Sequence, residues 1–260
     1  MVIPNYTNLR NKINMRYFTA EEIKQKNRLE ITEVLKGCAG KNIKYNFGIK
    51  VFKKYAEIAS LTSNANILDL GTASGEFMKQ LHNSGYNNLF AHDIDTYLPD
   101  EVKKIVKEYK ISDLSMDKNP WPDNFFDVIT AWCVLPHLEN PFHCARELNR
   151  VLKHGGIFMF TTPHLLSKPS IDFFLEHKYF AGYRPSNNHI ALLPLSVLEK
   201  TIFRGFELMG IEHLVTPKVN RGIKGKLRKF LLYLARYNNK LRSFLEKRWA
   251  YNICYIIRKV

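Results

Sequence analysis

The stretch ILDLGTASGEF, residues 67–77, decides the fold. An apolar segment that contains one acid, Asp69, ends in a turn bracketed by Gly71 and Gly75. A short apolar segment bounded by glycine is typical of a strand in a buried parallel sheet, and glycine lets the backbone turn sharply. The pattern therefore predicts a strand, a tight turn and a helix. It also places an acid at the carboxyl end of the strand, where open α/β sheets bind ligands.

Further expected strands and helices alternate along the chain. Strands are expected at residues 66–70, 89–93, 109–112, 126–132, 157–162, 207–215 and 251–257. Helices are expected at residues 19–35 (opened by a Thr19–Glu22 capping box), 48–61, 76–83, 141–152 and 194–203. The sequence His154-Gly155-Gly156 is expected to end the helix over 141–152. This alternation predicts an α/β fold with a doubly wound parallel sheet.

The composition is that of an ordinary globular protein, with 260 residues of which 45% are hydrophobic and 24% charged. No apolar run approaches the roughly 18 residues that span a bilayer, and the first residues lack the apolar core of a secretory signal. The four cysteines, Cys38, Cys133, Cys144 and Cys254, are scattered. We therefore expect a cytoplasmic protein without a disulfide framework and without a metal site.

The net charge of +15 is concentrated near the end of the chain. Residues 217–260 contain 13 Lys and Arg but a single acid, Glu246, whereas the rest of the chain is nearly neutral. Such a block favours an anionic partner, which could be nucleic acid, anionic lipid or an acidic glycan.

Two more acids stand at expected strand ends. Asp93 ends the second strand and Asp113 follows the third. One carboxylate can accept both hydroxyls of a ribose, and another can accept from an adenine amino group. A dinucleotide site would use GxGxxG, whereas this turn reads GTASG and follows an acid that repels a pyrophosphate. The same acid attracts an ammonium group, so the pattern favours S-adenosyl-L-methionine (SAM) over NAD.

Five segments taken together resemble the class I SAM-dependent methyltransferases of the methyltransferase-11 and -23 types. They are ILDLGTASG, AHDID, ISDL, PWPDNFFDVITAWCVLPHL and ARELNRVLKHGGIFMFTTP, within residues 67–163. The resemblance implies a seven-stranded Rossmann-like sheet whose last strand is antiparallel, with helices on both faces. The chain departs from the family at Ala73, where many members have glycine.

The resemblance also implies which residues hold the cofactor. Asp69, Gly71 and Gly75, with Thr72 in the same turn, would surround its amino-acid end. The remaining positions would meet the ribose, the adenine and the sulfonium in that order: Asp93 and Ile94, Asp113 and Leu114, and Ala131 and Trp132. The alternative for Asp93 and for Asp113 is a purely local role in a turn or a helix cap.

An oxygen acceptor would need a general base, and histidine is the usual choice. The candidate catalytic residues are His137 after the fourth strand, His164 after the fifth and His189 further on; the alternative for each is packing. The sequence lacks the (N/D)PP(Y/F) motif of nucleobase amine methylation, and Cys133 lacks the context of a pyrimidine-attacking cysteine. These absences weaken a nucleobase acceptor and leave ribose methylation open.

The segments TTPHLLSKPS and NNHIALLPLSVLEKTIFRGFELMGIE resemble methyltransferases of bacterial surface-polysaccharide and lipopolysaccharide biosynthesis. This resemblance implies a sugar hydroxyl, or a phosphate, of a glycan or glycolipid precursor as the acceptor. Two alternatives stay open. One is an RNA methyltransferase that grips RNA with its basic C-terminal region, and the other is a non-catalytic SAM-binding scaffold.

Residues 221–249 form a basic amphipathic segment, expected as a helix or a helical pair before the last strand. Its apolar side groups Leu227, Phe230, Leu231, Leu234, Leu241, Leu245 and Trp249, and Lys229, Arg236, Lys240 and Lys247 lie largely opposite. We expect contact with an anionic membrane surface at the inner face of the cytoplasmic membrane; the alternative is a helix packed on the body with a solvated basic face. The expected domains are a helical cover (1–62), a SAM-binding core (63–216, with an acceptor insert at about 164–193), the basic insert (217–250) and the final strand (251–260).

Overall fold

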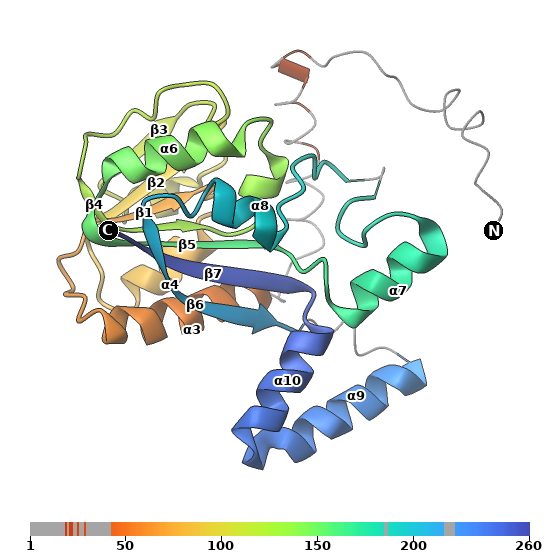
Figure 1. The fold of residues 1–260 in the computed structure, drawn as a ribbon. Coiled ribbons are helices and arrows are strands. Elements are labelled where there is room, and N and C mark those ends of the chain that lie inside the picture. Colours follow the sequence, from red (N-terminus) through yellow and green to blue (C-terminus); the bar gives the residue numbers. More distant parts are fainter. Residues whose placement is uncertain are drawn as a thin grey trace.

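Seven strands form one sheet in the order β3-β2-β1-β4-β5-β7-β6 in a computed structural model of the chain (Figure 1). The structure describes Thr19, Glu21, Glu22, Gln25, Leu29 and residues 43–184, 187–215 and 222–260. Strands β1 to β5 run parallel, and β7 runs antiparallel between β5 and β6. This confirms the expected doubly wound sheet with an antiparallel last strand. The strands are β1 (Ile67–Leu70), β2 (Leu89–Asp93), β3 (Glu108–Ile111), β4 (Phe126–Ala131), β5 (Leu152–Pro163), β6 (Phe206–Leu214) and β7 (Asn252–Lys259).

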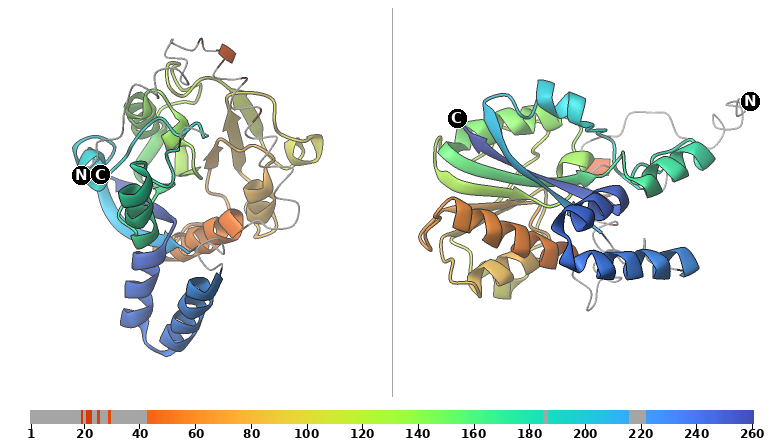
Figure 2. Two further views of the ribbon diagram at one scale, coloured as in Figure 1. Left: turned by 90° about the vertical axis from the view of Figure 1, so that its right-hand side faces the viewer. Right: turned by 60° about the horizontal axis from the view of Figure 1, so that its bottom comes forward.

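Helices cover both faces of the sheet, with α6 and α8 on one face and α3 and α4 on the other (Figure 1). Helices α7, α9 and α10 instead extend beyond the sheet at one edge (Figures 1 and 2). The helices are α3 (Ile43–Ile58), α4 (Glu76–His82), α5 (Asp100–Lys103), α6 (Pro141–Val151), α7 (Lys168–His177), α8 (Leu195–Lys200), α9 (Gly222–Leu234) and α10 (Asn239–Trp249), with single 3-10 turns η1 (Leu135–His137) and η3 (Ala235–Tyr237).

Each face of the sheet carries its own hydrophobic core. On one face, Phe52 of α3 and Phe77 of α4 pack edge to face over the sheet. On the other face, Leu148 of α6 and Leu198 of α8 pack against Phe160. Strands β1, β2 and β4 are buried almost throughout because both of their faces are covered, which is why their sequences read as nearly continuous apolar runs.

The sequence predicted the order of the strands, but it missed helices α5 and α7 and placed several boundaries wrongly. Helix α3 spans residues 43–58 instead of 48–61. Helix α6 ends where Leu152 becomes extended, so it is not stopped by the His154-Gly155-Gly156 sequence. Those residues lie inside β5, which begins at Leu152 and shifts register against β4. The glycines therefore serve an irregularity of the strand, where Gly155 has a φ of 74°.

The capping box near the N-terminus is confirmed. The Thr19 backbone N–H donates to Glu22 Oε2 at 2.8 Å, and the Glu22 backbone N–H donates to Thr19 Oγ1 at 3.3 Å. The rest of the helix expected over 19–35, and most of the expected cover over 1–62, lies outside the described residues. No helix in the described ranges is long and apolar enough to cross a membrane.

The basic insert forms a helical pair, which we call the α9–α10 hairpin (residues 222–249). It leaves the sheet after Leu214 of β6 and returns at Asn252 of β7, and these two residues pair with one another. Asn252 also pairs with Pro163 at the end of β5. The hairpin therefore begins and ends at the carboxyl edge of the parallel strands.

Candidate cofactor and acceptor site

Two buried acids lie side by side at the carboxyl edge of the sheet. Asp69 is near the end of β1 and Asp93 ends β2, and these strands are parallel neighbours in which Leu70 pairs with His92. The positions follow from the parallel pairing, because both strands present their last residues at the same edge. Two of the three expected acids are therefore brought together.

Asp93 connects the glycine turn to the second strand. Its Oδ2 accepts from the Ala73 backbone N–H and its Oδ1 from the Ile94 backbone N–H, each at 2.8 Å. Burial raises the pKa of Asp93 to about 6, although the two backbone hydrogen bonds oppose the rise. A carboxylate has about four acceptor positions, so two remain for the hydroxyls of a ribose. The local role in the turn and the expected role toward a ligand are thus compatible.

Asp69 is held by a partner that the sequence analysis missed. Its Oδ1 accepts from the Thr130 hydroxyl at 2.6 Å across the β1–β4 pair, while Thr72 Oγ1 donates to the Asp69 carbonyl at 2.7 Å. Burial is the main reason why the pKa of Asp69 rises to about 8. A cation bound here would favour the ionised carboxylate. The signal for Thr130 was available, since it is a polar residue inside the apolar run FDVITA.

The glycines of the turn are needed by its backbone and by its packing. Gly71 and Gly75 have φ values of 61° and 71°. A Cβ on Gly71 would lie 2.6 Å from Val134 Cγ2, and one on Gly75 would lie 2.5 Å from Val102 Cγ1. The space that the missing side chains leave is thus filled by protein and not by a ligand. Ala73, where the chain departs from the family, has a φ of 49°, a conformation that favours glycine.

The expected adenine side is built from the loop after β3. Asp113 Oδ1 accepts from the Ser115 backbone N–H, and the Asp113 backbone N–H donates to Asp117 Oδ2, both at 2.8 Å. Leu114 is buried, whereas Ile94 after β2 is half-buried. Asp113 thus shapes a turn, which is the local alternative, and its contact with an adenine stays a prediction.

The end of β4 carries the two residues that were expected to lie beside the sulfonium. Ala131 is fully buried, and the next residue, Trp132, packs edge to face on Phe77. A Cβ on Gly48 of α3 would lie 3.1 Å from the Trp132 ring, so glycine lets the helix approach the indole. The Trp132 indole N–H is buried and has no hydrogen-bond acceptor among the described residues. Cys133 follows with a φ of 62°, a strained conformation that is often found at functional sites.

Two of the three candidate histidines lie together. The rings of His137 in η1 and His189 have centroids 4.4 Å apart, and the centroid of the Tyr183 ring lies 5.4 Å from that of His189. His189 Nδ1 donates to the Gly182 carbonyl at 2.5 Å, so the neutral ring carries its lone pair on Nε2. The chain is fixed here because the Ile190 backbone N–H donates to the Pro136 carbonyl at 2.8 Å.

His164 belongs to a different group. Its ring lies 5.3 Å from that of His213 on β6, at the base of the α9–α10 hairpin. Burial, with smaller contributions from His213 and Lys247, lowers the pKa of His164 to about 4. Such a histidine is neutral at physiological pH and is a weak base. The structure thus separates His164 from the His137–His189 pair.

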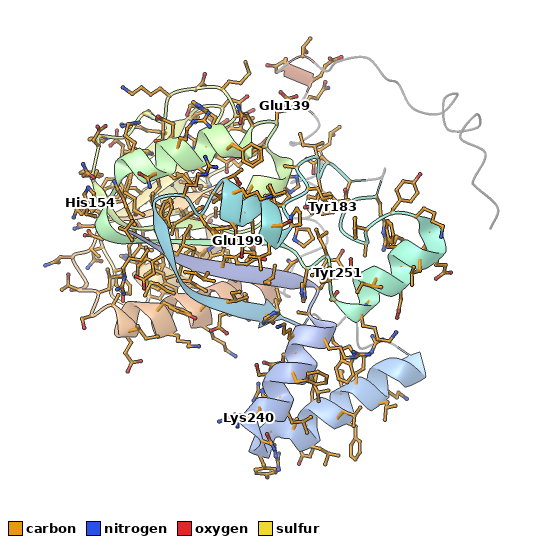
Figure 3. The ribbon with its side chains drawn as sticks, viewed as in Figure 1. Glu139, His154, Tyr183, Glu199, Lys240 and Tyr251 are labelled. Atoms are coloured by element: carbon orange, nitrogen blue, oxygen red, sulfur yellow. The ribbon has the colours of Figure 1, made fainter. Side chains whose placement is uncertain are left out.

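The buried acids and the candidate histidines lie at the carboxyl edge of the sheet. Figure 3 shows Tyr183 and Tyr251 at this edge and His154 at the opposite one. A surface hollow of about 290 Å³ lies between α3 and α4 near Ser60 and Tyr86, at the opposite edge. No cluster of three or more His, Cys, Asp or Glu suited to a metal ion occurs in the part of the chain that the structure describes.

Comparison with known proteins agrees with this geometry. Residues 68–160 match the family model of a methyltransferase domain. A 53-residue stretch is 43% identical to an uncharacterized methyltransferase of Schizosaccharomyces pombe (strain 972), covering 20% of this chain and 19% of that relative.

Solved structures share the fold at low sequence identity. A chain from the complex between the Haloferax volcanii Trm112 methyltransferase activator and a methyltransferase has a TM-score of 0.57 and 13% identity, covering 91% of this chain and 97% of that one. The [4+2]-cyclase SpnF has a TM-score of 0.54 and 18% identity, covering 81% and 80%. A SAM-dependent methyltransferase from Mesorhizobium loti has a TM-score of 0.50 and 16% identity, covering 78% and 96%.

Residues 68–160 match a methyltransferase domain, and the solved structures share the fold of this chain. These matches indicate S-adenosyl-L-methionine as the cofactor. The residues present fit this cofactor, because the Asp93 carboxylate keeps acceptor positions for ribose hydroxyls and the buried Asp69 carboxyl suits a cationic amine.

Proposed function

We propose that the protein is a SAM-dependent methyltransferase that acts on an oxygen acceptor, a sugar hydroxyl or phosphate of a glycan or glycolipid precursor. The observation that carries the activity is the pair of buried acids, Asp69 and Asp93, on either side of a glycine turn in a methyltransferase domain. The acceptor is inferred from the group formed by His137, His189 and Tyr183.

The cofactor supplies a methyl group that is already activated on a positively charged sulfur. The protein therefore needs mainly to orient the acceptor and to remove its proton. In this proposal Asp93 holds the ribose and Asp69 the amino-acid end, while Ala131 and Trp132 line the region of the sulfur.

His189 is the residue best suited to take the proton from an acceptor hydroxyl. Because its Nδ1–H is bonded to the Gly182 carbonyl, Nε2 is the basic nitrogen of the neutral ring. The neighbouring His137 ring and Tyr183 ring hold it in place. The low pKa of His164 makes that residue a weaker candidate.

The glycan acceptor rests on the resemblance of residues 161–170 and 187–212 to polysaccharide methyltransferases and on an aromatic surface at the carboxyl edge. Phe174 of α7 is partly exposed and stacks on Phe180, with ring centroids 4.8 Å apart. Flat apolar ring faces of this kind suit the C–H face of a sugar. An enzyme of this type would work in the cytoplasm, where lipid-linked glycans are assembled.

The test is transfer of a radiolabelled methyl group from SAM to separated glycan, lipid and RNA fractions of cells. We expect label in the glycan or lipid fraction, in an alkali-stable O-methyl group. Replacing His189 by Asn keeps a donor for the Gly182 carbonyl and removes Nε2, so we expect turnover to fall about a hundredfold or more while SAM affinity is retained.

The matched control is His154→Asn. His154 Nδ1 also bonds a backbone carbonyl, that of Val260, but at the opposite edge of the sheet, so this variant should keep full turnover. Asp93→Ala, which removes the ribose acceptor, should lose SAM binding and serves as the inactive reference. If only the RNA fraction is labelled, the acceptor is a ribose or a base and not a glycan. If the protein binds SAM but transfers no methyl group to any fraction, it is a non-catalytic SAM-binding scaffold. The cyclase SpnF, which shares this fold, shows that the architecture is not restricted to one activity.

A further inference from the structure

The α9–α10 hairpin leaves one side of its apolar surface uncovered. The sequence placed seven apolar residues on one side, but the structure divides them. Its small core consists of Ala235, Leu245 and Trp249, with Leu231 and Leu232 packed against them. Leu227, Phe230 and Leu234 remain 57%, 55% and 52% exposed. Their spacing of three and four residues puts them on one stripe of α9.

The turn of the hairpin extends this apolar surface. Tyr237 in η3 is 81% exposed, and Leu241 and Phe244 at the start of α10 are also exposed. Figure 3 shows Lys240 at this distal turn, far from the sheet. Exposed leucines and phenylalanines on successive turns of a helix mark a contact surface, since isolated exposed apolar residues would not be aligned.

Basic side chains accompany the stripe. Residues 225–249 carry eight basic side chains against one acid, Glu246, and they are Lys226, Arg228, Lys229, Arg236, Lys240, Arg242, Lys247 and Arg248. Glu246 is already paired with Arg242 at 2.9 Å. Lys226 and Lys229 are exposed on α9 beside the apolar stripe. The partner must therefore offer negative charge and apolar material at the same place.

We propose that the α9–α10 hairpin docks on the surface of an anionic lipid bilayer, with Leu227, Phe230 and Leu234 inserted below the headgroups. A bilayer surface offers phosphate groups for the lysines and acyl chains for the stripe within a few ångströms of depth. This inference is independent of the acceptor proposed above.

The other possible occupants fit the surface less well. RNA would pair with the cations and could stack on the exposed rings of Phe230 and Tyr237, but it offers no apolar material to Leu227, Leu234 and Leu241. A second copy of the chain would bring another eight basic side chains against the first set, which repel each other. Of these three partners, the bilayer is the one that can contact both the basic side chains and the apolar stripe.

Docking through this hairpin would turn the carboxyl edge of the sheet toward the membrane. The hairpin leaves the sheet beside Pro163 at the end of β5, and α10 contacts α7. Figure 2 shows α7 and α9 extending from the same edge. On α7, Leu175 is also exposed. An acceptor with a lipid tail could then reach the His137–His189 group without leaving the bilayer.

The experiment is flotation of the full-length protein with vesicles of phosphatidylcholine alone or mixed with phosphatidylglycerol. We expect binding to the anionic vesicles only. The variant L227S/F230S/L234S keeps every charge, and its partition should fall about tenfold or more. The matched control I58S/M116S/L208S changes three exposed apolar residues elsewhere on the body and should bind as the unmodified protein does. Equal SAM affinity in all variants, measured by calorimetry, shows that each is folded.

Three results would overturn the proposal. They are failure of the unmodified protein to bind anionic vesicles, equal binding by the stripe variant, and equal loss in the control variant. If the stripe variant still binds and K226Q/K229Q does not, the hairpin is a purely electrostatic surface, and salt-sensitive RNA binding becomes its explanation. These outcomes do not depend on methyl transfer, so they separate this proposal from the proposed function.

Discussion

At the scale of single residues, the buried Asp69 couples the stability of the protein to pH. Its carboxyl is buried beside Asp93 and hydrogen-bonded to Thr130. Burial raises the pKa of Asp69 to about 8, far above its value in the unfolded chain. The folded protein thus holds a proton that the unfolded chain releases above about pH 4, and the free energy of unfolding falls between about pH 4 and pH 8 through this group.

Replacing Asp69 by Asn should therefore stabilise the protein at high pH. Asparagine keeps an oxygen for the Thr130 hydroxyl and cannot ionise. We expect the free energy of unfolding of the variant, relative to the unmodified protein, to rise by about 3–4 kcal/mol between pH 5 and pH 8. Denaturant unfolding at the two pH values measures this difference.

The same substitution should weaken SAM binding, because the negative charge opposite the cationic amine is lost. A stability difference that stays constant between pH 5 and pH 8 would show that Asp69 is already ionised in the free protein. The pH dependence of other groups cancels in the comparison, since both proteins share them.

At the scale of elements, Lys259 of the last strand forms hydrogen bonds to three other segments of the chain. The Lys259 ammonium donates to the carbonyls of Asn149 and Leu152 at 2.6 and 2.8 Å and to Asn124 Oδ1 at 3.0 Å. The two carbonyls lie at the C-terminal end of α6, where a positive charge is favourable. Burial lowers the pKa of Lys259, but three acceptors compensate for the desolvation of its charge.

Lys259→Met should leave these acceptors buried without a donor. We expect a loss of about 1–3 kcal/mol in the free energy of unfolding, which thermal or denaturant unfolding would detect. Lys118→Met, at an exposed position, is the control and should change stability little. An equal effect of the two substitutions would mean that Lys259 contributes no more than a surface lysine.

At the scale of the whole molecule, the hairpin and the sheet should differ in local stability. The hairpin core contains few buried side chains, Ala235, Leu245 and Trp249, whereas β1 and β4 are buried on both faces. Local opening needs less free energy where few apolar contacts break.

Hydrogen exchange measured by mass spectrometry should therefore show amides of α9 and α10 exchanging at least about tenfold faster than those of β1, β4 and β5. Helix α6, which packs fully on the sheet, is the internal reference for a helix with a large core. Equal protection of α9 and α6 would contradict a weakly held hairpin.

The sequence by itself determined the elements and the position of the acids within them. The apolar runs and the glycine turn were sufficient to predict β1, β2 and β4 to within a residue or two, because buried parallel strands have distinctive composition. Asp69 and Asp93 were placed at strand ends for the same reason. The antiparallel β7 was expected from the family resemblance, not from local pattern.

Only the tertiary structure decided which of these residues meet. Thr130 reaches Asp69, and His137 reaches His189 while His164 does not, because pairing and loop packing join segments far apart in the chain. The same holds for the hairpin, where helical periodicity grouped the leucines but could not tell Leu245, which is buried against α9, from Leu227, which is exposed. Periodicity fixes the side of an element on which a residue lies, and the neighbouring element fixes whether that side is covered.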